Sequence, residues 1–572
     1  MNRRATEVGV VGKVARRWRA MLCVVAVALG LRLGYIVETR ELPTVRHLVG
    51  DASGYHEWAG RIAAGAWLGS EPFYQAPLYP YTLAVVFKVF GDPVWMVRIV
   101  QAFWGAAAVG LLALGAARMF GHRAGILAGI MLALYAPALF FDGIVQKTSL
   151  GCVLTCATMA VLATAQTWKR RAMPALVLGV LVALLSLVRE NALAWVPIIG
   201  LWVAVTWRGT QGWGRAIAAF AIGVGFILLP VGVRNVVVSG EWSITTFQAG
   251  PNFYIGNSAQ ADGRYQPLVR GHETPTFERQ DATELAQRAA GRKLTAREVS
   301  TYWMARAWKD IGDDPGRWVR LMTRKLLMVV NAYEVSDVES QYIHEDSSVV
   351  LSLLGRVWHF GILCPLAVVG VVATRTQWRS LWVYHALMVS MALAVAVFYV
   401  LARYRFPLVP LLIPFAAVGS VWLWDRAVRR EFGAMFPPIV AAIAVGLIVN
   451  QPIHDERRLD ALASMNVGVA LAQAGDLDAA IPYFKSAVAR HPESPEANNN
   501  LAQALALQGE YERAIEHYQR ALAVEPALPG LHYNLAVALE RVGRVEEALH
   551  FYKQAVEHDP SDADARAATQ RL

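Results

Sequence analysis

Long apolar runs, separated by short polar segments, dominate the first 450 residues. The first extends from Ala20 to Val37, and later ones fall near 95–117, 124–141, 148–166, 172–188, 192–206, 216–233, 349–373, 380–401, 406–424 and 434–450. About 20 apolar residues span a bilayer as a helix, which bonds all its backbone groups internally. The pattern predicts an all-α polytopic bundle of about 11 spans over residues 20–451. The shorter apolar segment Leu78–Phe90 is expected to lie at the interface or to insert partly.

Basic residues gather at every second connection between these runs. The clusters are Arg118/Arg123, Lys169/Arg170/Arg171, Arg208/Arg215, Arg375/Arg379 and Arg426/Arg429/Arg430. Cytoplasmic loops carry an excess of Lys and Arg, so these loops and a basic tail at residues 1–19 are predicted to be cytoplasmic. An odd number of spans then places the C-terminus outside. Two long external segments, about 38–94 and 234–348, are the natural places for chemistry.

Composition narrows the class of protein. Hydrophobic residues make up 55% and charged residues 17% of the chain, which argues against a cytosolic enzyme. The net charge of +10 does not form one patch, as nucleic-acid binding would require. Neither a phosphate-binding glycine loop nor a GxSxG elbow occurs in the sequence. We expect no cofactor and no protein metal ligands, with a divalent metal left open.

After Pro452 the apolar runs stop and the sequence repeats every 34 residues. Three windows, starting at Ala461, Pro495 and Pro529, align without gaps. Each has two small residues, an aromatic residue and a closing proline at matching positions: Gly468, Ala502 and Ala536; Ala480, Ala514 and Ala548; Phe484, Tyr518 and Tyr552; Pro492, Pro526 and Pro560. This period is typical of tetratricopeptide repeats. We therefore predict three repeats over 461–572, stacked as an α-solenoid.

The first external segment contains Gly50-Asp51-Ala-Ser-Gly-Tyr55 and, further on, Gln75-Ala-Pro77-Leu-Tyr79-Pro. A carboxylate at the membrane surface could accept a proton from a hydroxyl nucleophile. Taken alone, a loop Asp such as Asp51 is more often a helix N-cap.

Three stretches together resemble the GT-C glycosyltransferases, specifically the bacterial relatives of protein O-mannosyltransferases (glycosyltransferase family 39) and of the lipid A aminoarabinose transferase. They are the loop around Asp51, then Arg189-Glu190-Asn191, then Gly250-Pro-Asn252-Phe-Tyr254-Ile-Gly-Asn257. The resemblance covers roughly residues 20–420. It implies a sugar donor linked to polyprenyl phosphate, a hydroxyl acceptor on protein, lipid A or a cell-surface glycan, and an enzyme in the bacterial inner membrane.

The resemblance also implies roles for individual residues. Asp51 matches the general base, and Arg189 matches the basic residue that contacts the lipid phosphate. Gln75 and Ala76 stand where aminoarabinose transferases have a Glu-Lys pair, which removes a metal ligand and a phosphate contact. Further substrate contacts are expected at Tyr55, Gln75, Tyr79, Asn252, Tyr254 and Asn257.

Four basic residues near external span ends run against the charge trend. Arg403 and Arg405 are candidates for binding the lipid phosphate, because a guanidinium can grip two phosphate oxygens; headgroup anchoring is the equal alternative. For Arg98 and Lys147 we favour interfacial anchoring. Arg32, inside the first run, is expected to snorkel toward the far interface.

The sequence thus predicts an inverting membrane glycosyltransferase with a periplasmic tetratricopeptide domain. A concave groove with Asn466, Asn498, Asn499, Gln503, Asn534 and Glu540 would suit an extended peptide. Two alternatives stay open: a non-catalytic membrane-anchored scaffold, and an oligosaccharide ligase or polymerase of another membrane fold.

Overall fold

The computed structural model describes residues 2–269, 275–337, 339–528 and 530–572. The predicted basic side chains from Arg3 to Arg17, and Pro529 at the start of the third repeat window, lie outside the described part. The chain divides into two compact units. One consists of Met1–Arg40, Gly50–Val335 and Glu345–Ile453; the other consists of Glu41–Val49, Ser336–His344 and His454–Leu572.

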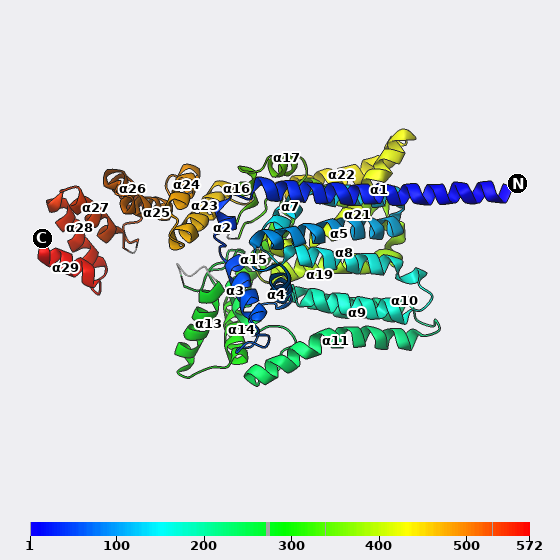
Figure 1. Cartoon of the computed structure of the whole chain (residues 1–572), viewed down its shortest axis with the longest axis horizontal. Coiled ribbons are helices and arrows are strands. Elements are labelled where there is room, and N and C mark those ends of the chain that lie inside the picture. Colours follow the sequence, from blue (N-terminus) through cyan, green and yellow to red (C-terminus); the bar gives the residue numbers. More distant parts are fainter. Residues whose placement is uncertain (1, 270–274, 338, 529) are drawn as a thin grey trace. The chain divides into compact units, whose positions relative to one another are not determined.

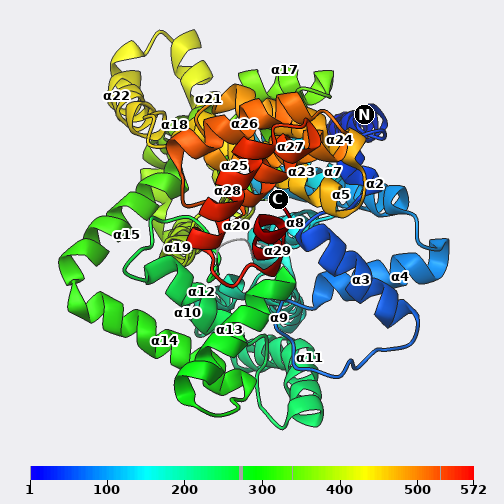
Figure 2. The same cartoon turned by 90° about the vertical axis from the view of Figure 1, so that its left-hand side faces the viewer.

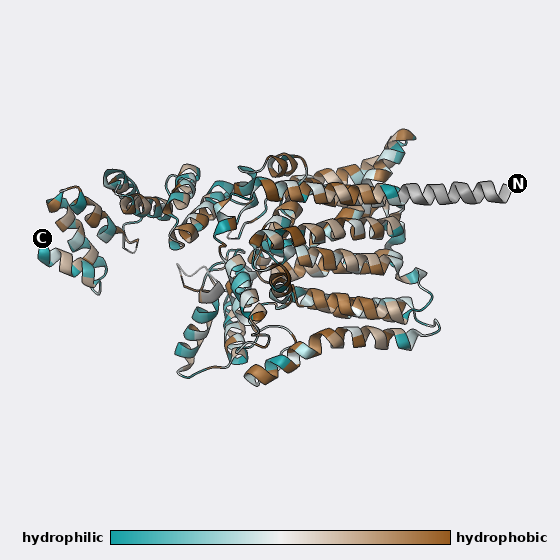
Figure 3. Cartoon of the chain, in the orientation of Figure 1, coloured by the Kyte–Doolittle hydropathy of each residue, from teal (hydrophilic) through white to brown (hydrophobic). Residues whose placement is uncertain are grey.

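The first unit is a bundle of apolar helices, and each of the predicted spans is helical (Figures 1 and 3). Seven helices in the described part are long and apolar enough to cross a membrane alone: α1 (Asn2–Glu38), α5 (Val94–Phe120), α8 (Thr148–Thr164), α11 (Trp213–Ser239), α19 (Trp378–Val397), α21 (Leu408–Val428) and α22 (Phe432–Val449). The predicted runs 172–188 and 192–206 form the shorter helices α9 (Ala172–Ser186) and α10 (Trp195–Thr206). The prediction of an all-α polytopic bundle is confirmed.

Two predicted spans are each broken into a bent pair. The helices α6 (His122–Ala133) and α7 (Ala136–Gly143) meet at 53°, and α17 (Val349–Val357) and α18 (Phe360–Ala373) meet at 43°. Pro137 stands in the first turn of α7, where its missing N–H and its ring prevent continuation of α6. At the second break the ring of His359 accepts the Gly361 N–H and caps α18.

Small residues allow close approach of helices in the bundle. A Cβ on Gly179 would overlap the Phe220 carbonyl where α9 packs on α11, and one on Gly370 would overlap the Phe415 carbonyl where α18 packs on α21. Such contacts are common between membrane helices, because close backbones gain van der Waals packing that lipid cannot supply.

Two arginines inside the bundle, Arg32 and Arg98, have hydrogen-bond partners there, which corrects the expectation for Arg32. Arg32 is 1% exposed and its Nε lies 2.7 Å from Asp142 on α7, so it does not snorkel. Arg98 is also buried and donates to the carbonyl of Gly143 and the hydroxyl of Thr39, which corrects its assignment as an interfacial anchor. The sequence did not reveal these partners because they come from other helices.

The two predicted external segments gather at one end of the bundle (Figures 1 and 2). The first contributes α3 (Asp51–Ala63) and α4 (Leu78–Phe90), which pack together. The second contributes α12 (Ala249–Asn257), α13 (Pro275–Ala290), α14 (Ala296–Asp313) and α15 (Pro315–Val330). Short turns, including η2 (Glu190–Ala194) and α20 (Ala402–Arg405), join the spans at this end.

The second unit contains three helix pairs and a closing helix: α23 (Glu456–Gln473), α24 (Leu477–Arg490), α25 (Pro495–Leu507), α26 (Tyr511–Val524), α27 (Leu531–Arg541), α28 (Val545–His558) and α29 (Ala563–Arg571). The repeated aromatic residues Phe484, Tyr518 and Tyr552 are buried within these pairs. A Cβ on Gly468 would lie 2.6 Å from the Phe484 ring, so the small residue makes room for the aromatic one. The predicted repeats are confirmed as helix pairs.

Two short segments from between the spans belong to this second unit as well. The first is Glu41–Val49, which contains the helix α2 (Pro43–Arg46). The second is Ser336–His344, which contains most of the helix α16 (Gln341–Glu345). His47 lies 3.4 Å from the Asp476 carboxylate at the start of α24. The repeat unit is therefore built from more of the chain than the repeats themselves.

Candidate active site

Asp51 is the first residue of α3, and the backbone before it is unusual. Gly50 adopts φ 58° and ψ −130°, a conformation that is open to glycine and strained for other residues. The N-cap position of α3 is occupied by Gly50 and Asp51 is the first helical residue, so the structure does not support the N-cap interpretation. The sharp turn directs the carboxylate to other partners.

Those partners are cationic and polar. Asp51 forms a buried ion pair with Arg403 on α20, and the side chain of Gln75 donates a hydrogen bond to it. Burial alone would raise the pKa of the Asp51 carboxyl. The charges of Arg403 and Lys147 and the hydrogen bonds from Arg403 and Gln75 outweigh burial and hold that pKa below its usual range. Asp51 is therefore a stabilised anion, and Arg403 is its buried partner, which argues against a headgroup anchor.

Arg189 lies beside this pair, between α9 and η2. Its side chain is buried, its Nη2 donates to Thr148 Oγ1 at 2.8 Å, and its guanidinium lies 5.4 Å from the Tyr404 ring. Among the described residues, its Nε and Nη1 have no hydrogen-bond partner. A buried cationic donor without a partner is costly, since it loses its bonds to water and gains none. Arg189 is thus prepared for an anionic ligand.

Lys147 adds a further cation to the cluster, which corrects its assignment as an interfacial anchor. It is 5% exposed, and its Nζ lies 5.9 Å from the centre of the Tyr55 ring. Burial lowers the pKa of Lys147 to about 8, although the carboxylates of Glu190 and Asp51 favour its charged form. The sequence did not predict that Lys147 is buried in this cluster, because a single Lys at the end of a span has the same local pattern as a Lys at the membrane interface.

Tyr55 stands one turn after Asp51 on α3 and is fully buried. Its hydroxyl has no hydrogen-bond partner among the described residues. The Tyr79 ring contacts it edge-on at 5.3 Å, but the Tyr79 hydroxyl is already bonded to Gln101 at 2.6 Å. Of these two predicted contacts, the geometry leaves Tyr55 available for a ligand and uses Tyr79 as its support.

Glu278 on α13 is a carboxylate of the cluster that sequence reasoning missed. Its oxygens accept hydrogen bonds from Tyr74 at 3.1 Å and Tyr265 at 3.3 Å. Burial, followed by the negative charge of Asp51, raises the pKa of Glu278 to about 7. No local motif marks it, because it comes from a polar helix more than 200 residues after Asp51 in the chain.

The structure places the remaining predicted contacts elsewhere. Arg405 is bonded to Glu334 at 2.6 Å and to the Asn331 carbonyl. Asn257 bonds Val397 O, Trp318 and Lys325, and Tyr254 packs on Trp303. Asn252 alone of the α12 residues reaches the cluster, accepting from Tyr399, whose ring contacts Tyr404.

The glycines of the same α12 motif have a packing role. A Cβ on Gly250 would overlap the Ser300 carbonyl, and one on Gly256 would overlap the Phe398 carbonyl. The motif therefore seats α12 tightly, and Asn257 fixes it to neighbouring segments.

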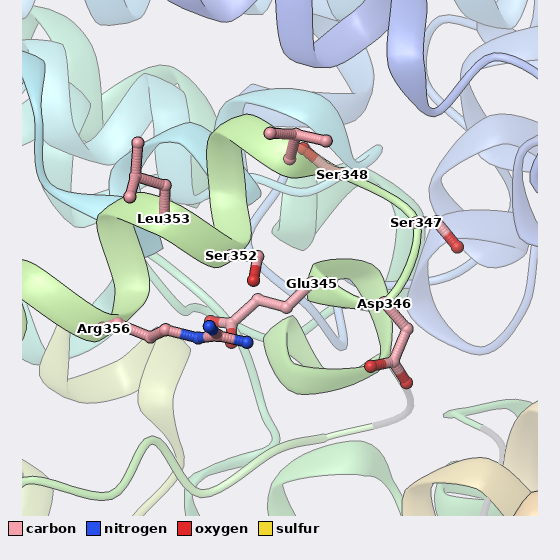
Figure 4. Close-up of a pocket in the computed structure, with 8 residues that line it drawn as sticks. Glu345, Asp346, Ser347, Ser348, Ser352, Leu353 and Arg356 are labelled. Atoms are coloured by element: carbon pink, nitrogen blue, oxygen red, sulfur yellow. The ribbon is translucent and has the colours of Figure 1, made fainter.

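A pocket of about 470 Å³ lies elsewhere in the unit, around α17 (Figure 4). It is lined by Glu345, Asp346, Ser347, Ser348, Val349, Ser352, Leu353 and Arg356, with the side chains of Glu345 and Arg356 directed toward one another. It contains none of the predicted site residues, so the candidate active site is the Asp51 cluster.

In the repeat unit, two of the predicted groove residues hold the repeats together instead. Asn498 bonds the carbonyls of Pro492 and Ser494 and the ring of His517. Glu540 accepts from Tyr552 and pairs with Arg571. These polar side chains are therefore occupied, which corrects their assignment to a peptide groove.

Comparison with known proteins gave matches for both parts of the chain. Residues 74–233 match the family described as dolichyl-phosphate-mannose-protein mannosyltransferase. Residues 454–495, 468–532 and 505–572 match tetratricopeptide-repeat families. The comparison with curated proteins found no match.

Three solved structures are similar to parts of the chain. ArnT from Cupriavidus metallidurans, bound to undecaprenyl phosphate, has 16% identity and a TM-score of 0.42, covering 94% of this chain and 80% of that one. The Archaeoglobus fulgidus oligosaccharyltransferase has 13% identity and a TM-score of 0.43, covering 80% and 56%. The Arabidopsis OM64 tetratricopeptide domain has 16% identity and a TM-score of 0.20, covering 20% and 95%.

The family matches, together with the apolar bundle, define the class of protein. They indicate a membrane glycosyltransferase that is similar, over residues 74–233, to the dolichyl-phosphate-mannose-protein mannosyltransferase family and that carries C-terminal tetratricopeptide repeats. The resemblance stated from the loop motifs is confirmed at this level.

Proposed function

We propose that this chain transfers a sugar from a polyprenyl-phosphate donor to a hydroxyl acceptor on the external face of the bacterial inner membrane. The observation that carries the proposal is the Arg189 guanidinium, which is buried next to Lys147 and Arg403 and has two donors without a partner among the described residues. A phosphate supplies acceptor oxygens for these two Arg189 donors. The name of the matching family, which includes dolichyl phosphate, supports a donor of this chemistry.

The chemistry follows from the positions of the charges. Arg189 and Arg403 hold the lipid phosphate, while the acceptor oxygen attacks the sugar C1 from the opposite side and the configuration inverts. The C1–O bond to phosphate breaks, and the cations stabilise the charge that develops on the leaving oxygen. A carboxylate takes the proton of the acceptor. The family resemblance gives that role to Asp51, which is one of the carboxylates of the site.

Tyr55 and Gln75 are the proposed contacts to the sugar or acceptor. The Tyr55 hydroxyl is buried with no partner in the part of the chain that the structure describes, and Gln75 bonds Asp51. Asn252, through Tyr399, is a more distant candidate. Arg405, Tyr79, Tyr254 and Asn257 are left out of the proposed contacts because their side chains are engaged by Glu334, Gln101, Trp303 and Val397, respectively.

The proposed sidedness rests on the alternation of basic clusters, which puts the tetratricopeptide unit in the periplasm. A reporter that is active only in the periplasm, fused after Leu572, should be active. Activity of a cytoplasm-only reporter at that position would overturn the topology. We also propose that the repeats bind an acceptor or a partner protein.

The function is tested with the full-length chain in lipid nanodiscs and a panel of polyprenyl-phosphate sugars, mannose first. We expect transfer of one sugar, read by intact mass of the acceptor, and a strong loss in Asp51→Asn with insertion unchanged. Transfer of a glycan block would favour the ligase alternative. Unaltered acceptors with every donor would favour the scaffold.

A further inference from the structure

Two of the carboxylates at this site, Asp51 and Glu278, have different surroundings. Asp51 is held by Arg403 and Gln75, with Lys147 nearby. These partners stabilise its ionised form, and a stabilised anion is a weak base. A general base works best when its pKa lies near the working pH. Asp51 is therefore better suited to hold Arg403 than to remove a proton.

Glu278 is linked to Asp51 by two independent paths. Tyr74 bonds Glu278 while its neighbour Gln75 bonds Asp51, and consecutive Cα atoms lie only about 3.8 Å apart. On the other side, Tyr265 bonds Glu278, and ring contacts lead through Tyr399 to Tyr404 and Arg403. The two carboxylates thus belong to one site.

Among the described residues, the groups that face Glu278 come from several neighbouring elements. Asp51 on α3 raises its pKa, Arg403 on α20 lowers it, and the loop residues Tyr74 and Tyr265 donate hydrogen bonds that also lower it. From α14, the uncharged side chains of Val299 and Trp303 pack with α13, and Trp303 donates to Ala282 O. Burial prevails, and the carboxyl titrates near neutrality.

We propose that Glu278 is the general base of this site, and that Asp51 is a positioning residue that holds Arg403 at the donor phosphate. The proposal rests on the proposed glycosyl transfer. As the acceptor oxygen bonds to C1, its O–H bond breaks and the proton passes to the Glu278 carboxylate. The electron pair of the C1–O bond leaves with the lipid phosphate.

The pKa values then support distinct roles for the two carboxylates. Where the environment gives two titratable groups very different pKa values, one group commonly stays ionised as a stabiliser and the other acts as the acid or base. Glu278 is deprotonated above about pH 7, so the transfer rate should rise with pH through about 7 and then level off. With Asp51 as the base, the acid limb would lie at much lower pH, because the pKa of Asp51 is lowered.

The experiment measures kcat/KM for the acceptor between pH 5 and 9, with full-length enzyme in nanodiscs and saturating polyprenyl-phosphate mannose, or the panel sugar that the wild type transfers. Glu278→Gln should lower the rate roughly 10²–10⁴-fold, the usual range for loss of a general base, and abolish the limb near pH 7. Glu278→Asp should restore part of the rate. Glu284→Gln, an exposed change on the same helix, is the matched control and should leave the profile unchanged.

Two further variants keep the inference testable if Glu278→Gln does not fold. Tyr74→Phe removes a donor that lowers the pKa of Glu278, so the limb should move to higher pH. Asp51→Asn removes the charge that raises that pKa, so the limb of the residual activity should move to lower pH.

A limb near pH 7 that persists in Glu278→Gln, or that does not move in Tyr74→Phe, would overturn the assignment while leaving glycosyl transfer standing. A wild type that transfers no sugar from any donor at any pH would overturn the proposed function and this inference with it.

Discussion

Replacement of Arg189 by methionine tests the phosphate site most directly. Methionine fills a similar volume, so it removes the guanidinium without leaving a large cavity. The variant loses the bond to Thr148 and the two donors, Nε and Nη1, that have no partner in the described structure.

The size of the effect follows from those two donors. A hydrogen bond involving a charged group contributes about 1.5–3 kcal/mol, so two of them contribute about 3–6 kcal/mol to donor binding. Because about 1.4 kcal/mol corresponds to a tenfold change, the Kd for polyprenyl phosphate should rise roughly 10²–10⁴-fold. The ligand-free protein should respond oppositely, since an unsatisfied buried donor costs about 1–3 kcal/mol. Its Tm should stay the same or rise.

The assay pairs binding of fluorescent polyprenyl phosphate in nanodiscs with thermal unfolding of the ligand-free protein. The Kd of Arg189→Lys should lie between those of the wild type and Arg189→Met, because lysine keeps the positive charge but loses the forked guanidinium. Arg405→Met is the contrasting variant: its guanidinium is buried but engaged by Glu334, so its Tm should fall. An Arg189→Met protein with a lower Tm and an unchanged Kd would show that Arg189 is structural.

Three other predictions concern neighbouring features. Gly50→Ala forces alanine into a glycine conformation at a cost of about 1–3 kcal/mol and should displace Asp51; normal transfer at normal Tm would contradict this. Asp142→Leu should destabilise the bundle by about 3–5 kcal/mol in thermal unfolding, and adding Arg32→Met should recover most of it; no recovery would mean that the pair is not coupled. Truncation after Asp455 should reduce transfer to the natural acceptor but spare a small surrogate hydroxyl; unchanged transfer to the natural acceptor would exclude delivery by the repeats.

The sequence predicts the helical bundle and the repeats well, because both depend on periodic local patterns. Span-length apolar runs become helices wherever backbone groups must bond internally. Likewise, the contact between Gly468 and the Phe484 ring is predictable, because both residues stand at fixed positions of the 34-residue repeat at which the two helices pack.

The site is only partly predictable. Asp51 and Arg189 stand in recognisable stretches, and the structure brings both into one cluster with Arg403. Glu278 and Lys147 could not be identified because burial and long-range charge, not neighbouring residues, decide their character. Arg405 carried the same local signal as Arg403, and only a distant carboxylate, Glu334, separates their roles.

The Arg32–Asp142 pair has a consequence for how the chain enters the membrane. An unpaired Arg within a span costs about 2.5–3.5 kcal/mol on insertion scales. Its carboxylate partner is synthesised 110 residues later, so α1 must wait for α7 before its charge is neutralised. Gly105 on α5 lies against the same pair, and a side chain there would overlap both charged groups. The first span should therefore remain near the insertion machinery until the bundle helices α5, α6 and α7 have been synthesised, so that these segments enter the membrane together.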